Sequence, residues 1–120
     1  FLTVFVLMGI SWSLAMSIQF LVLRSFYSQA RLLHAAFSLG VSSLGVAIPS
    51  SPGYIGVFEA AVVGALALFE IPFSIAFSNA VPLHILYVLM TGSFGVYTLA
   101  SSNISLGEIF QRVRGLNPQR

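Results

Sequence analysis

Two ionisable side chains lie in stretches of this chain that are otherwise apolar, and both can take part in ion-pair or acid–base chemistry. Glu59 follows a break rich in proline and glycine, and His84 lies in the last long apolar run. A charge buried in apolar surroundings is costly unless it is paired. We therefore expect Glu59 to pair with a cation, either a neighbouring Arg or His or a lipid amine, unless it reaches water at an interface. His84 is either that partner or a satisfied core histidine.

The break before Glu59 has the sequence Pro49-Ser-Ser-Pro-Gly-Tyr-Ile-Gly-Val-Phe-Glu59. The helix that follows would present free N–H groups and its positive dipole end, which together favour an anion. Gly53 and Gly56 would let a phosphate approach the main chain, and the hydroxyls of Ser50 and Ser51 add hydrogen-bond donors. The pattern predicts a site for a phospholipid head group. The alternative is an ordinary interfacial loop in which the serines cap the helix.

The residue types that are missing exclude other chemistry. The chain contains no Asp, Lys or Cys, so it has neither a thiolate metal site nor an aspartate for catalysis. Its acids are not spaced as a catalytic pair, and its two histidines are not at metal-ligand spacing. No clustered basic face for nucleic acid is present. We expect no catalytic residue, metal, cofactor or nucleic-acid partner, and no enzyme within this segment.

The composition indicates where these residues are held. The chain has 120 residues, of which 58% are hydrophobic and 7% charged, and its mean hydropathy is +0.97. Soluble domains carry roughly 25% charged residues, and disordered chains have low hydrophobicity. The sequence therefore predicts a multi-pass membrane segment. Because it begins with Phe1 and lacks a basic region before the first apolar run, we expect a piece of a longer protein rather than a cleaved signal peptide.

Charge-poor runs define the expected elements of an all-α, polytopic transmembrane helical bundle. The runs are about 1–23, 32–48, 54–69 and 73–100, followed by a short surface helix and tail at 105–120. A crossing helix needs about 20 apolar residues, which the first and last runs supply. The two middle runs are marginal. They are either two tilted short spans or two half-helices that meet at the proline–glycine break, in a re-entrant arrangement.

Arginines at the ends of the runs bear on the number of crossings. Positively charged loops collect on the cytoplasmic side of a membrane. If Arg24 and Arg31 share that side with Arg112 and Arg114, the chain between them crosses an even number of times. Three full spans would violate this condition. We therefore expect one of the short runs to insert only partially.

Small and polar side chains suggest which helix faces are buried. Small residues recur every four positions, as in Ser38 and Ser42 with Gly45, which is typical of close helix packing in lipid. We expect a bundle completed by the remaining transmembrane helices of a full-length protein or by a second copy of the chain. On the last run, His84 and Thr91 share one helical face, which we expect to meet protein or water.

The run Pro52-Gly-Tyr-Ile-Gly-Val-Phe-Glu59 resembles the Pro-Gly-Gly-Leu-Gly-Val-x-Glu signature of the lysylphosphatidylglycerol synthase transmembrane family. The lead-in Ile48-Pro49, and the spacing of eight residues between His84 and Gly92, are also similar to family patterns. The resemblance covers about residues 8 to 110, which correspond to the C-terminal third of a family domain. In this chain Tyr54 replaces the second glycine of the signature.

The resemblance implies a multi-pass, flippase-like protein of the bacterial inner membrane. Such a protein moves aminoacyl-phosphatidylglycerol or a related anionic phospholipid between leaflets, and some relatives carry a separate synthase domain. It also marks Pro52, Gly53, Gly56 and Glu59 as candidate lipid-binding positions, beside the candidates Ser50, Ser51 and His84. The alternative function is a non-catalytic structural or assembly subunit of a membrane complex, in which the break is only a tight, packed turn.

Overall fold

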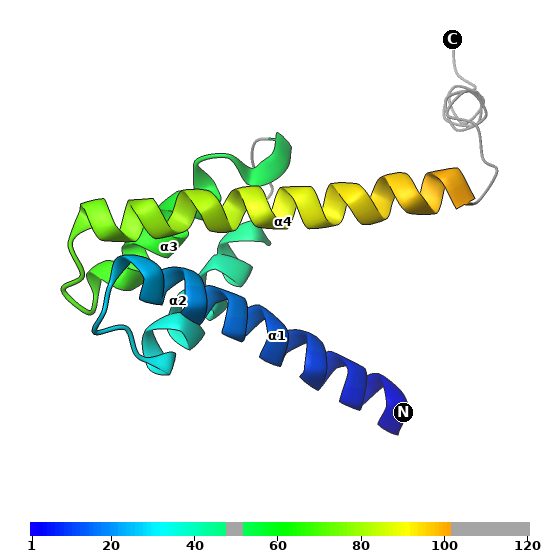
Figure 1. Ribbon diagram of the computed structural model, residues 1–120, viewed down its shortest axis with the longest axis horizontal. Helices are drawn as coiled ribbons and strands as arrows, with labels where there is room; N and C mark the ends of the chain where they lie inside the picture. Colours follow the sequence, from blue (N-terminus) through cyan, green and yellow to red (C-terminus); the bar gives the residue numbers. More distant parts are fainter. Residues whose placement is uncertain (48–51, 102–120) are drawn as a thin grey trace, which may run out of the picture. The chain divides into compact units, whose positions relative to one another are not determined.

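The computed structural model of the protein describes residues 1–47 and 52–101, and all regular elements in these ranges are helical. They are α1 (Leu2–Phe26), α2 (Leu32–Val46), the short 3-10 helix η1 (Pro52–Tyr54), α3 (Val57–Ala67) and α4 (Phe73–Ser101) (Figure 1). The expected all-α fold is confirmed. The expected surface helix and tail at 105–120 lie outside the described residues, as do Ser50 and Ser51.

Two of the described helices are long and apolar enough to cross a membrane. They are α1, with 25 residues, and α4, with 29 residues, which continues through Pro82. At 1.5 Å per residue they measure about 37 and 43 Å, more than the ~30 Å of a hydrocarbon core. The 15 residues of α2 and 11 of α3 give only about 22 and 16 Å. Neither short helix reaches across the core by itself.

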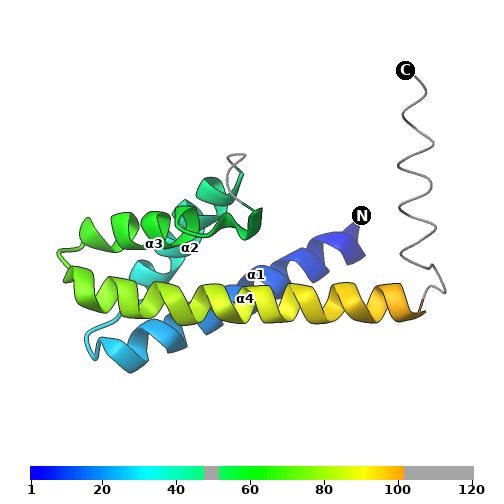
Figure 2. The same cartoon turned by 90° about the horizontal axis from the view of Figure 1, so that it is seen from above.

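The chain divides into two compact units, residues 1–86 and 87–120. In the first unit, α2 and α3 form an antiparallel hairpin beside α1 and the first half of α4 (Figures 1 and 2). The open end of the hairpin lies where α1 ends and α4 begins. There Phe69 contacts the rings of His34 and Phe37, with centroids 4.7 and 5.5 Å away. The hairpin therefore enters and leaves at the same end of the unit.

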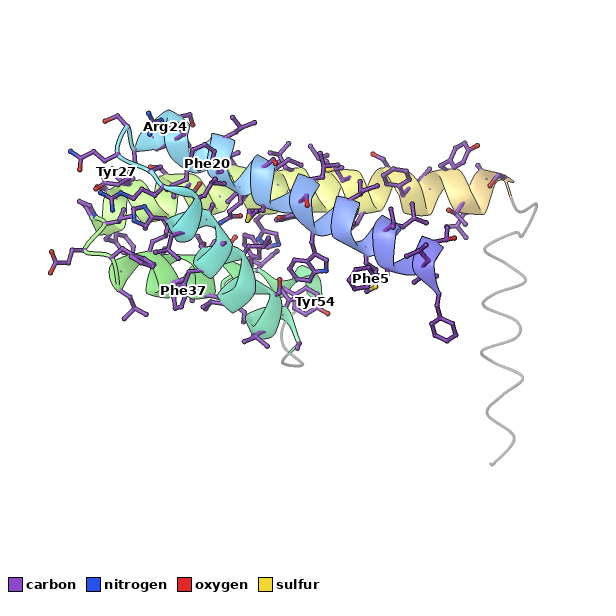
Figure 3. The ribbon with its side chains drawn as sticks, turned by 90° about the horizontal axis from the view of Figure 1, so that it is seen from below. Phe5, Phe20, Arg24, Tyr27, Phe37 and Tyr54 are labelled. Atoms are coloured by element: carbon purple, nitrogen blue, oxygen red, sulfur yellow. The ribbon has the colours of Figure 1, made fainter. Side chains whose placement is uncertain are left out.

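Figure 3 shows the two ends of this hairpin by their side chains. Arg24 and Tyr27 lie at its open end, and Tyr54 lies at the opposite end, the tip. The Arg24 guanidinium donates to the carbonyl oxygen of Ala30 (3.1 Å), which ties the connection between α1 and α2 to the end of α1. The largest fully buried apolar side chains of the unit come from α1, α3 and α4: Leu23, Val62, Leu66 and Leu83.

Of the described glycines, Gly45 of α2 has the closest neighbour, which belongs to α3. A Cβ atom on Gly45 would lie 3.0 Å from the Cβ of Ala61, so the helices could not keep this separation with a larger residue. Ser38 and Ser42 of the same helix are also buried. The small-residue face of α2 is thus a helix contact, as expected from the need for close backbone approach in lipid. A Cβ atom on Gly64 of α3, by contrast, would meet no atom from outside its own helix turn within 4 Å.

We expect Gly45→Ala to lower the free energy of unfolding by about 1–3 kcal/mol, because the added methyl group overpacks the contact with Ala61. Adding Ala61→Gly should restore part of the loss in a double-mutant cycle, measured on the full-length protein in micelles. The matched control is Gly64→Ala, which should be neutral or slightly stabilising because alanine favours helix. Equal losses for the two glycine substitutions would contradict the close contact.

Candidate functional site

The turn between η1 and α3 runs through the left-handed region of backbone conformation. Gly53, Tyr54 and Gly56 have φ values of 73°, 56° and 88°. Such values suit glycine but cost a residue with a Cβ atom roughly 1–3 kcal/mol. Tyr54 carries a Cβ atom and still adopts this conformation. Surrounding contacts must therefore hold this turn in place.

Glu59 closes the turn from the helix side. It occupies the first turn of α3, and its Oε2 accepts a hydrogen bond from the backbone N–H of Gly56 (2.7 Å). The Gly56 carbonyl in turn accepts from the N–H of Ala60 (2.9 Å) and begins the helix. A carboxylate at a helix N-terminus also interacts favourably with the helix dipole. The Gly56 N–H, a donor that we expected a ligand phosphate to use, therefore bonds to a negative charge of the protein itself.

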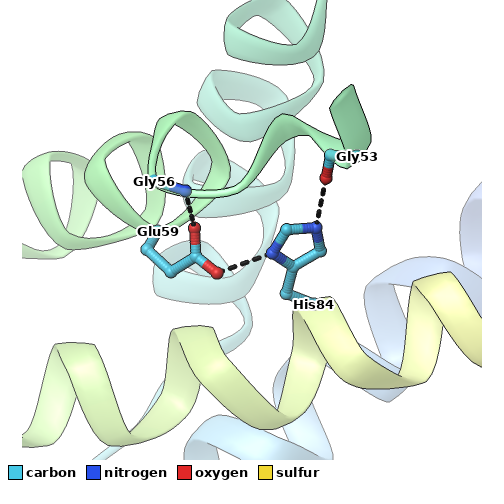
Figure 4. A network of polar contacts seen from close by, with 4 residues as sticks. All are labelled: Gly53, Gly56, Glu59 and His84. Atoms are coloured by element: carbon cyan, nitrogen blue, oxygen red, sulfur yellow. Dashed lines mark hydrogen bonds and ion pairs between the residues drawn. The ribbon is translucent and has the colours of Figure 1, made fainter. Parts of the chain in front are cut away.

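His84 joins the turn to α4 through both nitrogens of its ring (Figure 4). Its Nδ1 lies 2.6 Å from Glu59 Oε1, and its Nε2 lies 2.8 Å from the carbonyl oxygen of Gly53. The ring also packs against Phe58, with centroids 4.9 Å apart. The side chains of His84 and Glu59 are 11% and 17% exposed, so water has little access to the pair. Together with Gly56, these groups form a continuous polar network.

The structure brings together four of the predicted site residues: Gly53, Gly56, Glu59 and His84. Of the partners considered for Glu59, the structure shows the histidine. Pro52 begins η1, next to this network in the sequence. The described part of the chain contains no group of three side chains that could hold a metal ion.

The threonines of the expected polar face of α4 bond to their own helix. In the second unit, the Thr91 hydroxyl donates to the carbonyl oxygen of Tyr87 (2.6 Å), and the Thr98 hydroxyl donates to that of Phe94 (2.8 Å). Threonine hydroxyls in helices commonly bond in this way to the preceding turn. Because these bonds lie within the helix, they do not by themselves require a polar neighbour or water.

Buried amides form a second polar feature that we did not predict. Gln19 is fully buried and its Nε2 donates to the Ser38 hydroxyl (2.9 Å), which links α1 to α2. Asn79 of α4 is also fully buried, and neither of its amide atoms has a hydrogen-bond partner in the described structure. An amide within an apolar run was the available signal, because such groups are rarely buried without purpose.

An apolar groove of about 240 Å³ lies elsewhere in the first unit, between α1 and α2. Its lining residues are Trp12, Ser13, Met16, Ala36, Leu39 and Gly40. None of these belongs to the network at the turn. The groove therefore adds no polar chemistry to the site.

We expect strong energetic coupling between Glu59 and His84. Removing either partner leaves a poorly hydrated polar group unpaired, so Glu59→Ala and His84→Ala should each destabilise the protein, and the double variant by less than their sum. The coupling energy should be about 1.5–3 kcal/mol, as for hydrogen bonds to charged groups. Unfolding of the full-length protein in mixed micelles measures it.

The matched control pairs His84→Ala with Glu70→Ala. Glu70 is an exposed acid in the turn before α4, so these two changes should be additive within about 0.5 kcal/mol. Additivity of the Glu59 and His84 changes as well would show that the pair contributes nothing specific.

Comparison with known proteins gives one match. The sequence model of a family described as the lysylphosphatidylglycerol synthase TM region matches residues 1–95, which include α1, the hairpin, the turn and most of α4. Searches of curated proteins and of solved structures found no match.

Proposed function

The chain belongs to the lysylphosphatidylglycerol synthase transmembrane family and is a membrane protein, and from this premise we propose that it translocates phospholipid. In this proposal it is a multi-pass, flippase-like protein of the bacterial inner membrane. Its substrate is aminoacyl-phosphatidylglycerol or a related anionic phospholipid. The description of the family names a membrane region and no transport activity, so we infer the movement of lipid from the site.

One observation carries the proposal: a nearly buried acid–histidine pair lies at the tip of a hairpin in an otherwise apolar helical unit. Glu59 and His84 are in contact at 2.6 Å, beside the glycines of the turn. Ionisable groups within membrane proteins are costly and usually mark a path for a polar substrate. Broken helices at membrane depth mark binding sites in many transporters.

The chemistry of the pair suits both charges of an aminoacylated lipid. The ring of His84 can donate to a phosphate oxygen, and Ser50 and Ser51 would add hydroxyl donors next to the turn. A lipid ammonium can replace His84 as the partner of the Glu59 carboxylate. We propose that the head group passes the tip of the hairpin by exchanging with these internal partners, so that no charge is left unpaired on the way.

The transport hypothesis predicts that Glu59→Gln lowers the rate of leaflet exchange at least about tenfold, which corresponds to 1.4 kcal/mol in the barrier. The amide keeps the shape of the side chain but cannot neutralise an ammonium or imidazolium. The assay uses full-length protein in vesicles with fluorescent phosphatidylglycerol and an impermeant quencher.

Glu70→Gln is the matched control and should exchange lipid at the wild-type rate, because Glu70 is exposed and outside the network. If Glu59→Gln is folded and also keeps the wild-type rate, the transport role of this site is wrong. The network is then a packed structural turn, as expected of an assembly subunit, since all four of its members already bond to one another.

The hairpin also predicts the membrane topology. In our proposal, α2 and α3 enter and leave the membrane on one side, and α4 alone crosses between Ser28 and Ser101. Cysteines introduced at these two positions, in an otherwise cysteine-free protein, should react with an impermeant maleimide from opposite sides. Labelling from the same side would instead support the even number of crossings that the arginine distribution favours.

A further inference from the structure

The contacts of His84 restrict the number of protons that the site can hold. Nε2 faces the Gly53 carbonyl oxygen, which only accepts hydrogen bonds, so this nitrogen must carry a proton. Nδ1 faces Glu59 Oε1 at 2.6 Å, slightly closer than the roughly 2.7–2.9 Å of charge-assisted N–H···O bonds. If the carboxyl is ionised, Nδ1 must carry a second proton. If Nδ1 is bare, the carboxyl itself must be protonated.

The remaining combination is repulsive. A neutral imidazole protonated only at Nε2, opposite an ionised carboxylate, would direct the lone pair of Nδ1 at the lone pairs of Oε1. At 2.6 Å two acceptors without a proton between them repel each other. The observed geometry is therefore compatible with two protons on the pair and not with one.

We propose that Glu59 and His84 form a proton-binding site, and that the proton shared by Nδ1 and Oε1 holds the Gly53–Gly56 turn against α4. The ligand of this site is a hydrogen ion. Its loss to solvent base leaves one proton on Nε2 and a carboxylate facing a bare nitrogen, which pushes α4 and the first turn of α3 apart. This inference concerns protonation and does not depend on lipid transport.

No other charge in the described part of the first unit is placed to substitute for this proton. The guanidinium of Arg24 bonds to the connection after α1, and Figure 3 shows it at the end away from the tip. Arg31 is the N-cap residue of α2, beside His34 at that same end. His34 of α2 packs on Phe69 at that same end. The remaining titratable groups near the site are phenols: Tyr54 in the turn, and Tyr87 one helical turn beyond His84 on α4.

The turn has a strained backbone, so its conformation depends on the contacts that the proton maintains. Three residues of the turn have positive φ values, and Tyr54 is the one that pays a Cβ penalty there. The hydrogen bond to the Gly53 carbonyl and the bond to Glu59 are the described contacts through which His84 holds this turn. Weakening one of them favours release of the turn from α4.

Protons on the pair can be counted by NMR on the full-length protein in lipid nanodiscs, with ¹⁵N-labelled histidine and ¹³C-labelled glutamate. His84→Gln and Glu59→Gln spectra assign the signals, and His34 serves as an internal reference. At pH 7 we expect two protons, either on both ring nitrogens or on Nε2 and the carboxyl. A ring with one proton opposite an ionised carboxylate at pH 7 would overturn the proposal.

A distance measurement tests the movement. Spin labels at Ile55, in the turn, and Ile85, on α4, are both at exposed positions. Their separation should increase as pH rises through the loss of the shared proton seen by NMR. In His84→Asn, which keeps a donor but does not titrate, the separation should be independent of pH. An unchanged wild-type distance after the proton is lost would show that the proton does not hold the turn.

Discussion

Backbone polar groups that a membrane protein exposes to hydrocarbon must find their partners within the protein, because hydrocarbon offers no hydrogen bonds. This constraint explains why a proline- and glycine-rich turn can exist between α2 and α3. In this turn the Gly53 carbonyl accepts a hydrogen bond from His84 of α4, and the Gly56 N–H donates to Glu59 of α3. The short bond between Glu59 and His84 pairs these two side chains with each other. The same hydrogen bonds therefore hold the turn in the fold and form the candidate site.

The same need for partners limits how an anion could bind at the turn. A helix N-terminus next to flexible glycines attracts a phosphate, yet here the Glu59 carboxylate already accepts the Gly56 N–H. A phosphate can use that donor only if the carboxylate turns away, which would also free His84 from Glu59. Binding of a lipid phosphate and opening of the ion pair are thus linked by competition for shared partners, in the proposed transport cycle. The Glu59 carboxylate would thus take the place of the phosphate charge whenever no lipid is bound.

Much of the architecture could be predicted from the sequence. Low charge and long apolar runs predict helices. Glu59 is the acid, and His84 the histidine, that lies furthest from any run end, so their pairing was one of few options. The start of α3 at Val57, three residues later than the apolar run suggested, depends on positive φ values that include Tyr54, a residue type with little preference for them. The Gly53 carbonyl gave no signal at all, since every residue carries one.

Long-range packing explains the rest of what the sequence left open. Arginine positions suggested how many times the chain crosses, but they contain no information on which helix ends are neighbours. The contacts of Phe69 with His34 and Phe37 fix the hairpin's open end. Gln19 and Asn79 became notable only when their surroundings were known to exclude water. An amide in an apolar run looks the same whether it faces a cavity or a neighbouring helix.

The hairpin of α2 and α3 resembles a cantilever in mechanical terms. Both of its connections and the ring contacts of Phe69 are at one end, and Gly45 packs closely against Ala61 between the two helices. A small rotation at this open end therefore becomes a larger displacement at the tip, where His84 bonds to Glu59 and to the Gly53 carbonyl.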